Sequence, residues 1–326
     1  APPAIMSVFI GSQLSQMLDE IETSGISTNP AEDAVEEFSL NLPKIPEIFL
    51  DNTDRNRTSP FAFTGNKFEF RAVGSSANCA KPMIALNLAL AEQLRVFRKE
   101  VDAQVEKSAN KEDAIYKILR RYIKESKRIR FEGNSYGDEW IEEAAKRGLA
   151  NVASTPEALK IMTSEEVIQM FEEHDVLTRR EVLARYEIDL ENYIKKIQIE
   201  SRIIGDLSHN HIIPTAIRYQ NTLVENVKGL KEVLDIKTFV KLSNSQMQNI
   251  KEISEHISIV RQLVADMIDK RKIANKIEDS AEKARLYNQE VLPFFEKIRY
   301  HVDKLELLVD DELWPLPKYR ELLFIK

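Results

Sequence analysis

Five charged residues in one short stretch have the types and spacing that chemistry on anionic substrates requires. Around a single carboxylate, Glu69, the stretch gathers Arg55, Arg57, Lys67 and Arg71. A glutamate can hold a hard divalent cation through its oxygens. An arginine can clamp a phosphate or a carboxylate with two parallel hydrogen bonds. The stretch therefore predicts a site that holds a divalent cation and binds oxyanions.

The alternation of residue types after Lys67 predicts the strand that positions this site. Phe68, Phe70 and Ala72 should point to one face, and Lys67, Glu69 and Arg71 to the other. A period of two is typical of a β-strand, here with an aromatic core face and a charged face. The alternative is an ordinary solvated face with cross-strand ion pairs. The neighbouring Arg-Asn-Arg-Thr-Ser turn argues against that alternative.

The same residues carry a resemblance to a known family. Residues 55–59, Arg-Asn-Arg-Thr-Ser, resemble the Arg-Asn-Arg-Ser segment of glutamine synthetases, and residues 67–71 resemble their Glu-x-Arg strand. The wording of residues 56–71 is most similar to the type III enzymes. So are residues 133–140, Gly-Asn-Ser-Tyr-Gly-Asp-Glu-Trp, and the ending at residues 314–324. The resemblance runs from one end of the chain to the other.

The resemblance implies ATP-dependent ligation of ammonia to glutamate, through a γ-glutamyl phosphate, with Mg²⁺ or Mn²⁺. It implies that Glu69 is a metal ligand and that Arg71 is catalytic and binds substrate glutamate. It gives Arg57 a catalytic role with contacts to glutamate and ATP, and Lys67 a role in ATP binding. The chain departs from the better-known types at Ala62, where they have a further arginine. This chain would then supply one wall of an active site.

Composition and the start of the chain limit the class of protein. A net charge of −7 and a pI near 5.5 argue against nucleic-acid binding. No apolar run reaches the ~20 residues that span a membrane. The single Cys79 fits a reducing compartment, so a cytoplasmic location is expected. The start at Ala1, without Met, predicts a processed chain or a fragment. The resemblance favours a fragment that is inactive alone. It also implies a homo-oligomer, a dodecamer of stacked hexameric rings.

The expected fold is α+β in two domains. Residues 1–150 are expected to be the C-terminal part of a glutamine-synthetase-like catalytic domain with a truncated antiparallel sheet. An acidic insertion occupies about residues 12–50, where Lys44 is the one basic residue. Residues 151–326 contain few prolines and glycines, which predicts long antiparallel helices.

Apolar spacing of three and four residues marks the helices expected after residue 83. One stripe contains Leu86, Leu90, Leu94 and Phe97, and a longer series runs from Ile250 to Val309. Pro214 and Pro293 are expected to kink or break their helices. None of the histidines at positions 209, 211, 256 and 301 has the spacing of a helical metal pair. Capping or core packing is expected for these four.

Two other function classes remain open from the residues. Long helical seams are typical of a non-catalytic assembly scaffold. The metal and arginine chemistry also fits another carboxylate–amine ligase, such as a glutamate–cysteine ligase. The Arg-Asn-Arg-Thr-Ser turn disfavours the scaffold, which has no need of it.

Overall fold

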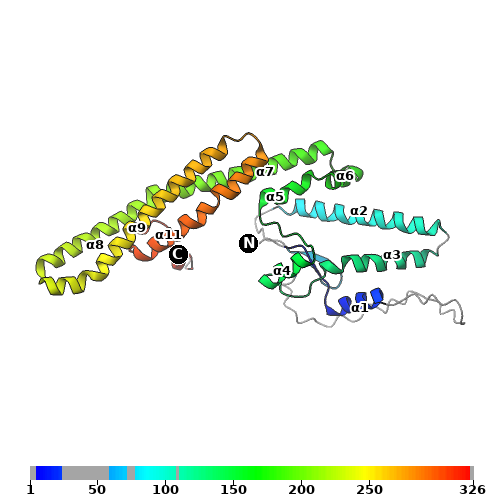
Figure 1. The fold of residues 1–326 in the computed structure, drawn as a ribbon, viewed down its shortest axis with the longest axis horizontal. Helices are drawn as coiled ribbons and strands as arrows, with labels where there is room; N and C mark the ends of the chain where they lie inside the picture. Colours follow the sequence, from blue (N-terminus) through cyan, green and yellow to red (C-terminus); the bar gives the residue numbers. More distant parts are fainter. Residues whose placement is uncertain (1–4, 24–58, 72–77, 108–109, 324–326) are drawn as a thin grey trace. The chain divides into compact units, whose positions relative to one another are not determined.

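The chain folds as two compact units (Figure 1). The computed structural model describes residues 5–23, 59–71, 78–107 and 110–323. Unit 1 comprises residues 1–153 and 166–178, and unit 2 comprises residues 154–165 and 179–326. The described residues of unit 1 hold the strands, and those of unit 2 form helices only. The α+β class is therefore confirmed.

A small sheet in unit 1 positions the charged stretch. Its order is β1 (Val8–Phe9), β2 (Phe61–Phe63) and β3 (Phe68–Phe70). β2 and β3 are antiparallel, but β1 pairs with β2 in parallel. The sheet is thus mixed, and the expectation of an antiparallel sheet was wrong for β1. A parallel pair needs a long crossover, and residues 10–60 supply it between these two strands.

The β2–β3 hairpin shows which face of the sheet is buried. Ala62 pairs with Glu69, so their side chains share a face, and Ala62 is fully buried there. Phe68 and Phe70 are 49% and 38% exposed on the other face. The expected aromatic core face was therefore wrong. Phe61 and Phe68 stack on each other instead, with ring centroids 4.8 Å apart.

One helix of unit 1 lies between β1 and β2 along the chain, and the others follow β3. Their bounds are α1 Ser12–Thr23, α2 Ala80–Val105, α3 Lys111–Ser126, the 3-10 turn η2 Lys127–Ile129, α4 Asp138–Lys146 and α6 Glu165–Glu173. α1 lies at the start of the acidic segment. In α2 the buried residues are Leu88 and Val101, whereas Leu90 and Leu94 are each 58% exposed. The stripe expected along α2 is therefore not its buried face.

A second core in unit 1 joins α4 to the chain that follows η2. Trp140 is buried and stacks on Phe131 with ring centroids 3.7 Å apart. The Arg147 guanidinium lies over Trp140, 5.4 Å from the ring centroid. Gly148, at φ +69°, takes the left-handed conformation that ends α4, as its type predicts. This core holds the segment beside β1, because Val8 and Arg130 form a parallel bridge.

Unit 2 is a bundle of long helices (Figure 1). Its elements are α5 Thr155–Lys160, η3 Ile161–Thr163, α7 Arg179–Asp206, η4 Leu207–Ile212, α8 Ile213–Val233, α9 Ile236–Asn275, α10 Ser280–Leu286, η5 Tyr287–Val291, α11 Pro293–Leu308 and α12 Tyr319–Leu322. The long apolar series predicted from Ile250 onward is confirmed as a buried seam along α9, where Ile253, Val260 and Val264 are fully buried. It is interrupted between Asn275 and Ser280, where α9 ends. None of the helices described could cross a membrane.

Both interior prolines of unit 2 follow a π-helical turn. η4 precedes Pro214 and η5 precedes Pro293. In these turns the Ile213 amide donates to Ser208 and the Leu292 amide to Tyr287, five residues back. A proline crowds the carbonyl four residues earlier, and the wider turn relieves that crowding. The helices therefore run on through a π-turn instead of breaking.

Candidate active-site strand

Glu69 lies between two cations on the face of β3. The Arg71 Nη2 atom is 3.2 Å from Glu69 Oε2, and the Lys67 Nζ atom is 3.9 Å from Glu69 Oε1. The side chains of Lys67, Glu69 and Arg71 are 66%, 40% and 26% exposed. The structure thus brings these three predicted residues together. The Glu69 carboxylate stays accessible from solvent and could take a cation there.

The hairpin fixes the strand through its turn and its base. Gly65 has a φ of +100°, which residues with a Cβ rarely adopt. The Thr64 amide donates to the Lys67 carbonyl at 2.9 Å, and the Arg71 amide donates to Pro60 at 2.6 Å. These bonds close both ends of β3 and orient its charged face.

Ser59 anchors the approach to the hairpin. It is fully buried, accepts a hydrogen bond from Ser7 Oγ at 2.8 Å and donates to the Phe131 carbonyl at 3.2 Å. Arg57, two residues earlier, and Arg55 lie outside the described residues. The Arg57 prediction is therefore untested, although the chain next to it is held beside the sheet.

One donor of Arg71 has no acceptor among the residues that the structure describes. Its Nη1 atom is buried, and no described residue accepts a hydrogen bond from it. A buried charged donor without an acceptor costs roughly 1–3 kcal/mol or more. A bound carboxylate or phosphate would supply the acceptor, and the planar guanidinium suits either group.

A metal centre cannot be completed from the described residues alone. Among them no group of three or more His, Cys, Asp and Glu side chains is placed to hold a metal ion. Glu69 fits a Mg²⁺ or Mn²⁺ ion as one oxygen ligand, since these ions accept carboxylate together with water and substrate oxygens. Further protein ligands would have to come from elsewhere.

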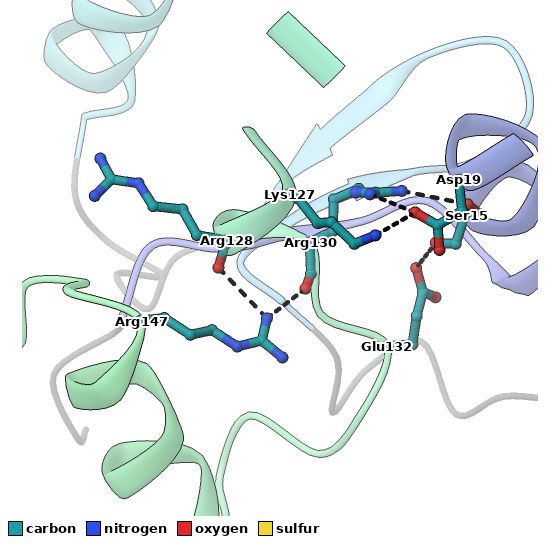
Figure 2. A pocket seen from close by; sticks show the side chains of 7 residues that line it. All are labelled: Ser15, Asp19, Lys127, Arg128, Arg130, Glu132 and Arg147. Atoms are coloured by element: carbon teal, nitrogen blue, oxygen red, sulfur yellow. Dashed lines mark hydrogen bonds and ion pairs between the residues drawn. The ribbon is translucent and has the colours of Figure 1, made fainter. Parts of the chain in front are cut away.

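A second charged cluster, which the sequence did not single out as a site, lines a hollow of about 330 Å³ (Figure 2). The residues that line it are Ser15, Asp19, Lys127, Arg128, Arg130, Glu132 and Arg147. We call this cluster the α1 hollow. The signal in the sequence was the run of lysines and arginines between residues 115 and 131.

The charges of the α1 hollow are largely used in holding α1. Arg130, with a side chain only 10% exposed, donates to Asp19 at 2.8 Å and to the Ser15 carbonyl at 3.2 Å. Glu132 accepts from Ser15 Oγ at 2.8 Å and from the Gly11 amide at 3.0 Å. The Arg130 hydrogen bond, followed by that of Lys127, lowers the pKa of Asp19. The side chains that line the hollow thus hold α1 against η2 and the residues that follow it.

Comparisons with known proteins agree with the resemblance. The family model for the glutamine synthetase C-terminal domain matches residues 114–231. A glutamine synthetase of Bacteroides fragilis (strain YCH46) is 49% identical over 100% of this chain and 45% of the relative. A type-3 glutamine synthetase of Dictyostelium discoideum is 36% identical over 100% of this chain and 44% of the relative. A glutamine synthetase of Butyrivibrio fibrisolvens is 32% identical over 99% of this chain and 45% of the relative.

The chain spans less than half the length of these relatives, but its own length is matched almost throughout. The type III resemblance is confirmed, since one of the relatives carries that description. The whole-length matches and the matched C-terminal domain show that the chain belongs to the glutamine synthetase family.

Proposed function

We propose that this chain forms one wall of a site in which ammonia is ligated to glutamate at the expense of ATP, giving glutamine. The observation that carries the proposal is the charged face of β3, where accessible Glu69 lies beside Arg71, whose buried Nη1 atom has no acceptor among the described residues. That pairing of an oxygen ligand with an anion clamp suits a phosphorylated carboxylate intermediate. The relatives named glutamine synthetase supply the reaction.

Each residue of the charged strip, which comprises Lys67, Glu69 and Arg71, has a proposed role in that reaction, and so has Arg57. Arg71 holds a substrate carboxylate, and Glu69 is one ligand of Mg²⁺ or Mn²⁺. When bound, such an ion offsets the charge that develops on the transferred phosphoryl group. Lys67 and Arg57 contact ATP phosphate, and Arg57 also contacts glutamate. Positioning cations at that charge is usually a large part of phosphoryl-transfer catalysis.

The finer properties of the whole protein belong to the same proposal. We propose that the 326 residues lack activity alone and act within a cytoplasmic homo-oligomer of stacked hexameric rings. We also propose that residues 1–150 belong to the catalytic domain and residues 151–326 form a separate helical domain. If α7 to α11 contribute contacts between subunits, deleting residues 178–326 from a full-length protein should break up the oligomer. Its mass on light scattering should then fall by more than the mass of the deleted residues. A full-size oligomer after the deletion would contradict the assembly proposal.

A glutamine-forming assay on a full-length protein that carries this chain tests the proposed reaction. Arg71→Lys keeps the charge but loses the planar fork, so it should raise the KM for glutamate and lower kcat. Arg98→Lys is the matched control, since Arg98 only pairs with Asp102 on the exposed side of α2, at 3.6 Å. Equal kcat/KM in both variants would mean that Arg71 belongs to a surface ion-pair strip.

A further inference from the structure

Two histidines of unit 2 that are distant in sequence lie on two different helices and face each other. His256 lies on α9 and His301 on α11. Their Nδ1 atoms are 3.0 Å apart, and their ring centroids are 5.2 Å apart. Both rings are half-buried. At this distance a proton on one Nδ1 can be donated to the bare Nδ1 of the other ring, so the two nitrogens face each other.

The core of the bundle holds both rings in place. On α9, Ile253 and Ile257 are buried on either side of His256. On α11, Ile298 and Leu305 are buried before and after His301. The edge of His301 also packs on Tyr300, with ring centroids 5.1 Å apart. Because the helix backbones are fixed by packing, the two nitrogens are preorganised, which reduces the ordering cost of binding a ligand between them.

We propose that His256 and His301 bind one divalent transition-metal ion of the Cu²⁺ or Zn²⁺ class and that this ion links α9 to α11. Such ions accept imidazole nitrogen at about 2.0–2.1 Å. Two ligands at that distance, on adjacent positions of a four-coordinate ion, lie roughly 2.8–3.4 Å apart. The observed Nδ1 separation of 3.0 Å falls in that interval. The hydrogen bond aligns the rings along the line between the two nitrogens, so each ring would turn by roughly 40° to aim its lone pair at an ion 2.0–2.1 Å from both.

The protonation of His301 suits metal binding. A histidine ligates through a neutral imidazole. Burial, and secondarily the neighbouring His256, lowers the pKa of His301. The neutral form is therefore favoured at neutral pH. When the ion binds, the donating ring carries its proton on Nε2 in place of Nδ1, so the exchange of tautomers balances without release of a proton.

The chemistry of the pair separates it from the proposed Mg²⁺ or Mn²⁺ site. Glu69 offers a hard oxygen ligand in unit 1, whereas the histidines offer only nitrogen in unit 2. No third His, Cys, Asp or Glu among the described residues completes a larger group here. Water would fill the remaining positions. Two imidazoles and water favour Cu²⁺ first, then Zn²⁺, and do not favour Mg²⁺.

Titration of the 326-residue chain with CuSO₄, followed by calorimetry, tests the site. We expect one Cu²⁺ site per chain that is lost in His256→Asn and in His301→Asn. Asparagine keeps a polar side chain but supplies no imidazole. His209→Asn is the matched control, because His209 is exposed on η4, and it should retain the site. Binding that survives both substitutions in the pair, or that is lost in the control, would overturn the proposal.

Two further readouts do not depend on how the variants fold. ZnCl₂ should raise the melting temperature of the unmutated chain, since an ion that binds only the folded state stabilises it, and MgCl₂ at the same concentration should not. The electron paramagnetic resonance spectrum of bound Cu²⁺ should show coupling to two nitrogen nuclei. A spectrum of oxygen ligands only, or equal shifts with Zn²⁺ and Mg²⁺, would show that the histidines form only a hydrogen-bonded pair.

Discussion

Two charged clusters in unit 1 contain the same residue types but use them differently. In the α1 hollow, Glu132 accepts hydrogen bonds from Ser15 and from backbone amides, and Asp19 pairs with Arg130. On β3, the partners of the Glu69 carboxylate among the described residues are Lys67 and Arg71, each two residues away along the chain. The comparison teaches that abundance of charge does not mark a site. The better indicator is a carboxylate whose described partners are near it along the chain, because such a carboxylate does not hold distant segments together.

The largest predicted difference between the two clusters is in kcat, after one carboxylate has been removed from each. In a full-length protein, Glu69→Gln keeps the shape of the side chain but removes the charge that holds a cation. We expect kcat to fall by roughly 10²–10³, the usual effect of deleting one electrostatic contact to the transition state. Glutamine formation under saturating substrates measures it.

Glu132→Gln is the matched control for that experiment. It should keep near-native kcat, because Glu132 supports α1 and has no proposed contact with substrate. If Glu132→Gln lost as much turnover as Glu69→Gln, the α1 hollow would be part of the active site.

The free energy of unfolding should depend more on the α1 hollow than on the charged face of β3. Arg130→Ala removes a mostly buried side chain that joins Asp19 and the Ser15 carbonyl. We expect the free energy of unfolding of the domain containing unit 1 to fall by about 2–3 kcal/mol, since charged hydrogen bonds to buried groups are lost. Lys67→Ala, on the exposed end of the strip, should change it by less than about 0.5 kcal/mol. Urea denaturation followed by circular dichroism separates the two, and equal effects would contradict the structural role of the hollow.

A smaller effect than that of Arg130→Ala is expected for a third carboxylate, in the contact between α2 and the end of α6. Arg95, with a second contribution from His174, lowers the pKa of Glu92 to about 2 from its ordinary 4.5. Because the folded pKa is the lower one, this stabilisation is complete above pH ~4.5 and is lost as pH falls towards 2. Glu92→Gln should therefore cost about 1 kcal/mol at pH 7, a partly exposed pair being screened by water.

The pH dependence of that difference is the check on Glu92. Unfolding of the two proteins measured between pH 7 and pH 2.5 should give curves that converge towards the acid end. A difference that grew as the pH fell would contradict the lowered pKa.

Local features of the fold could be predicted from the sequence. The alternation around Glu69 gave the strand and its charged face, and apolar spacing with few prolines gave the long helices of unit 2. Gly148 marked the end of α4. These features depend on neighbours within a few residues, which is the range over which sequence patterns carry information.

Features that depend on distant segments could not be predicted in this way. The parallel pairing of β1 with β2 joins Val8 to Phe61, and the histidine pair joins positions 45 residues apart. Which face of the sheet is buried depends on what packs against it, so Phe68 and Phe70 are exposed although a core face was expected for them. The sequence likewise predicted irregular backbone at Pro214 and Pro293. The π-turns found there could not be predicted, because they depend on which carbonyls of the preceding turn accept hydrogen bonds.

Mn²⁺ binding to a full-length protein tests the central claim most directly, because it reads Glu69 without requiring turnover. Titration followed by electron paramagnetic resonance should show that Glu69→Gln weakens Mn²⁺ binding, while Glu132→Gln binds Mn²⁺ as the unmutated protein does. That result would place the accessible carboxylate of β3 at the metal. Unchanged Mn²⁺ affinity in a well-folded Glu69→Gln protein would contradict the account and leave β3 as a surface ion-pair strip.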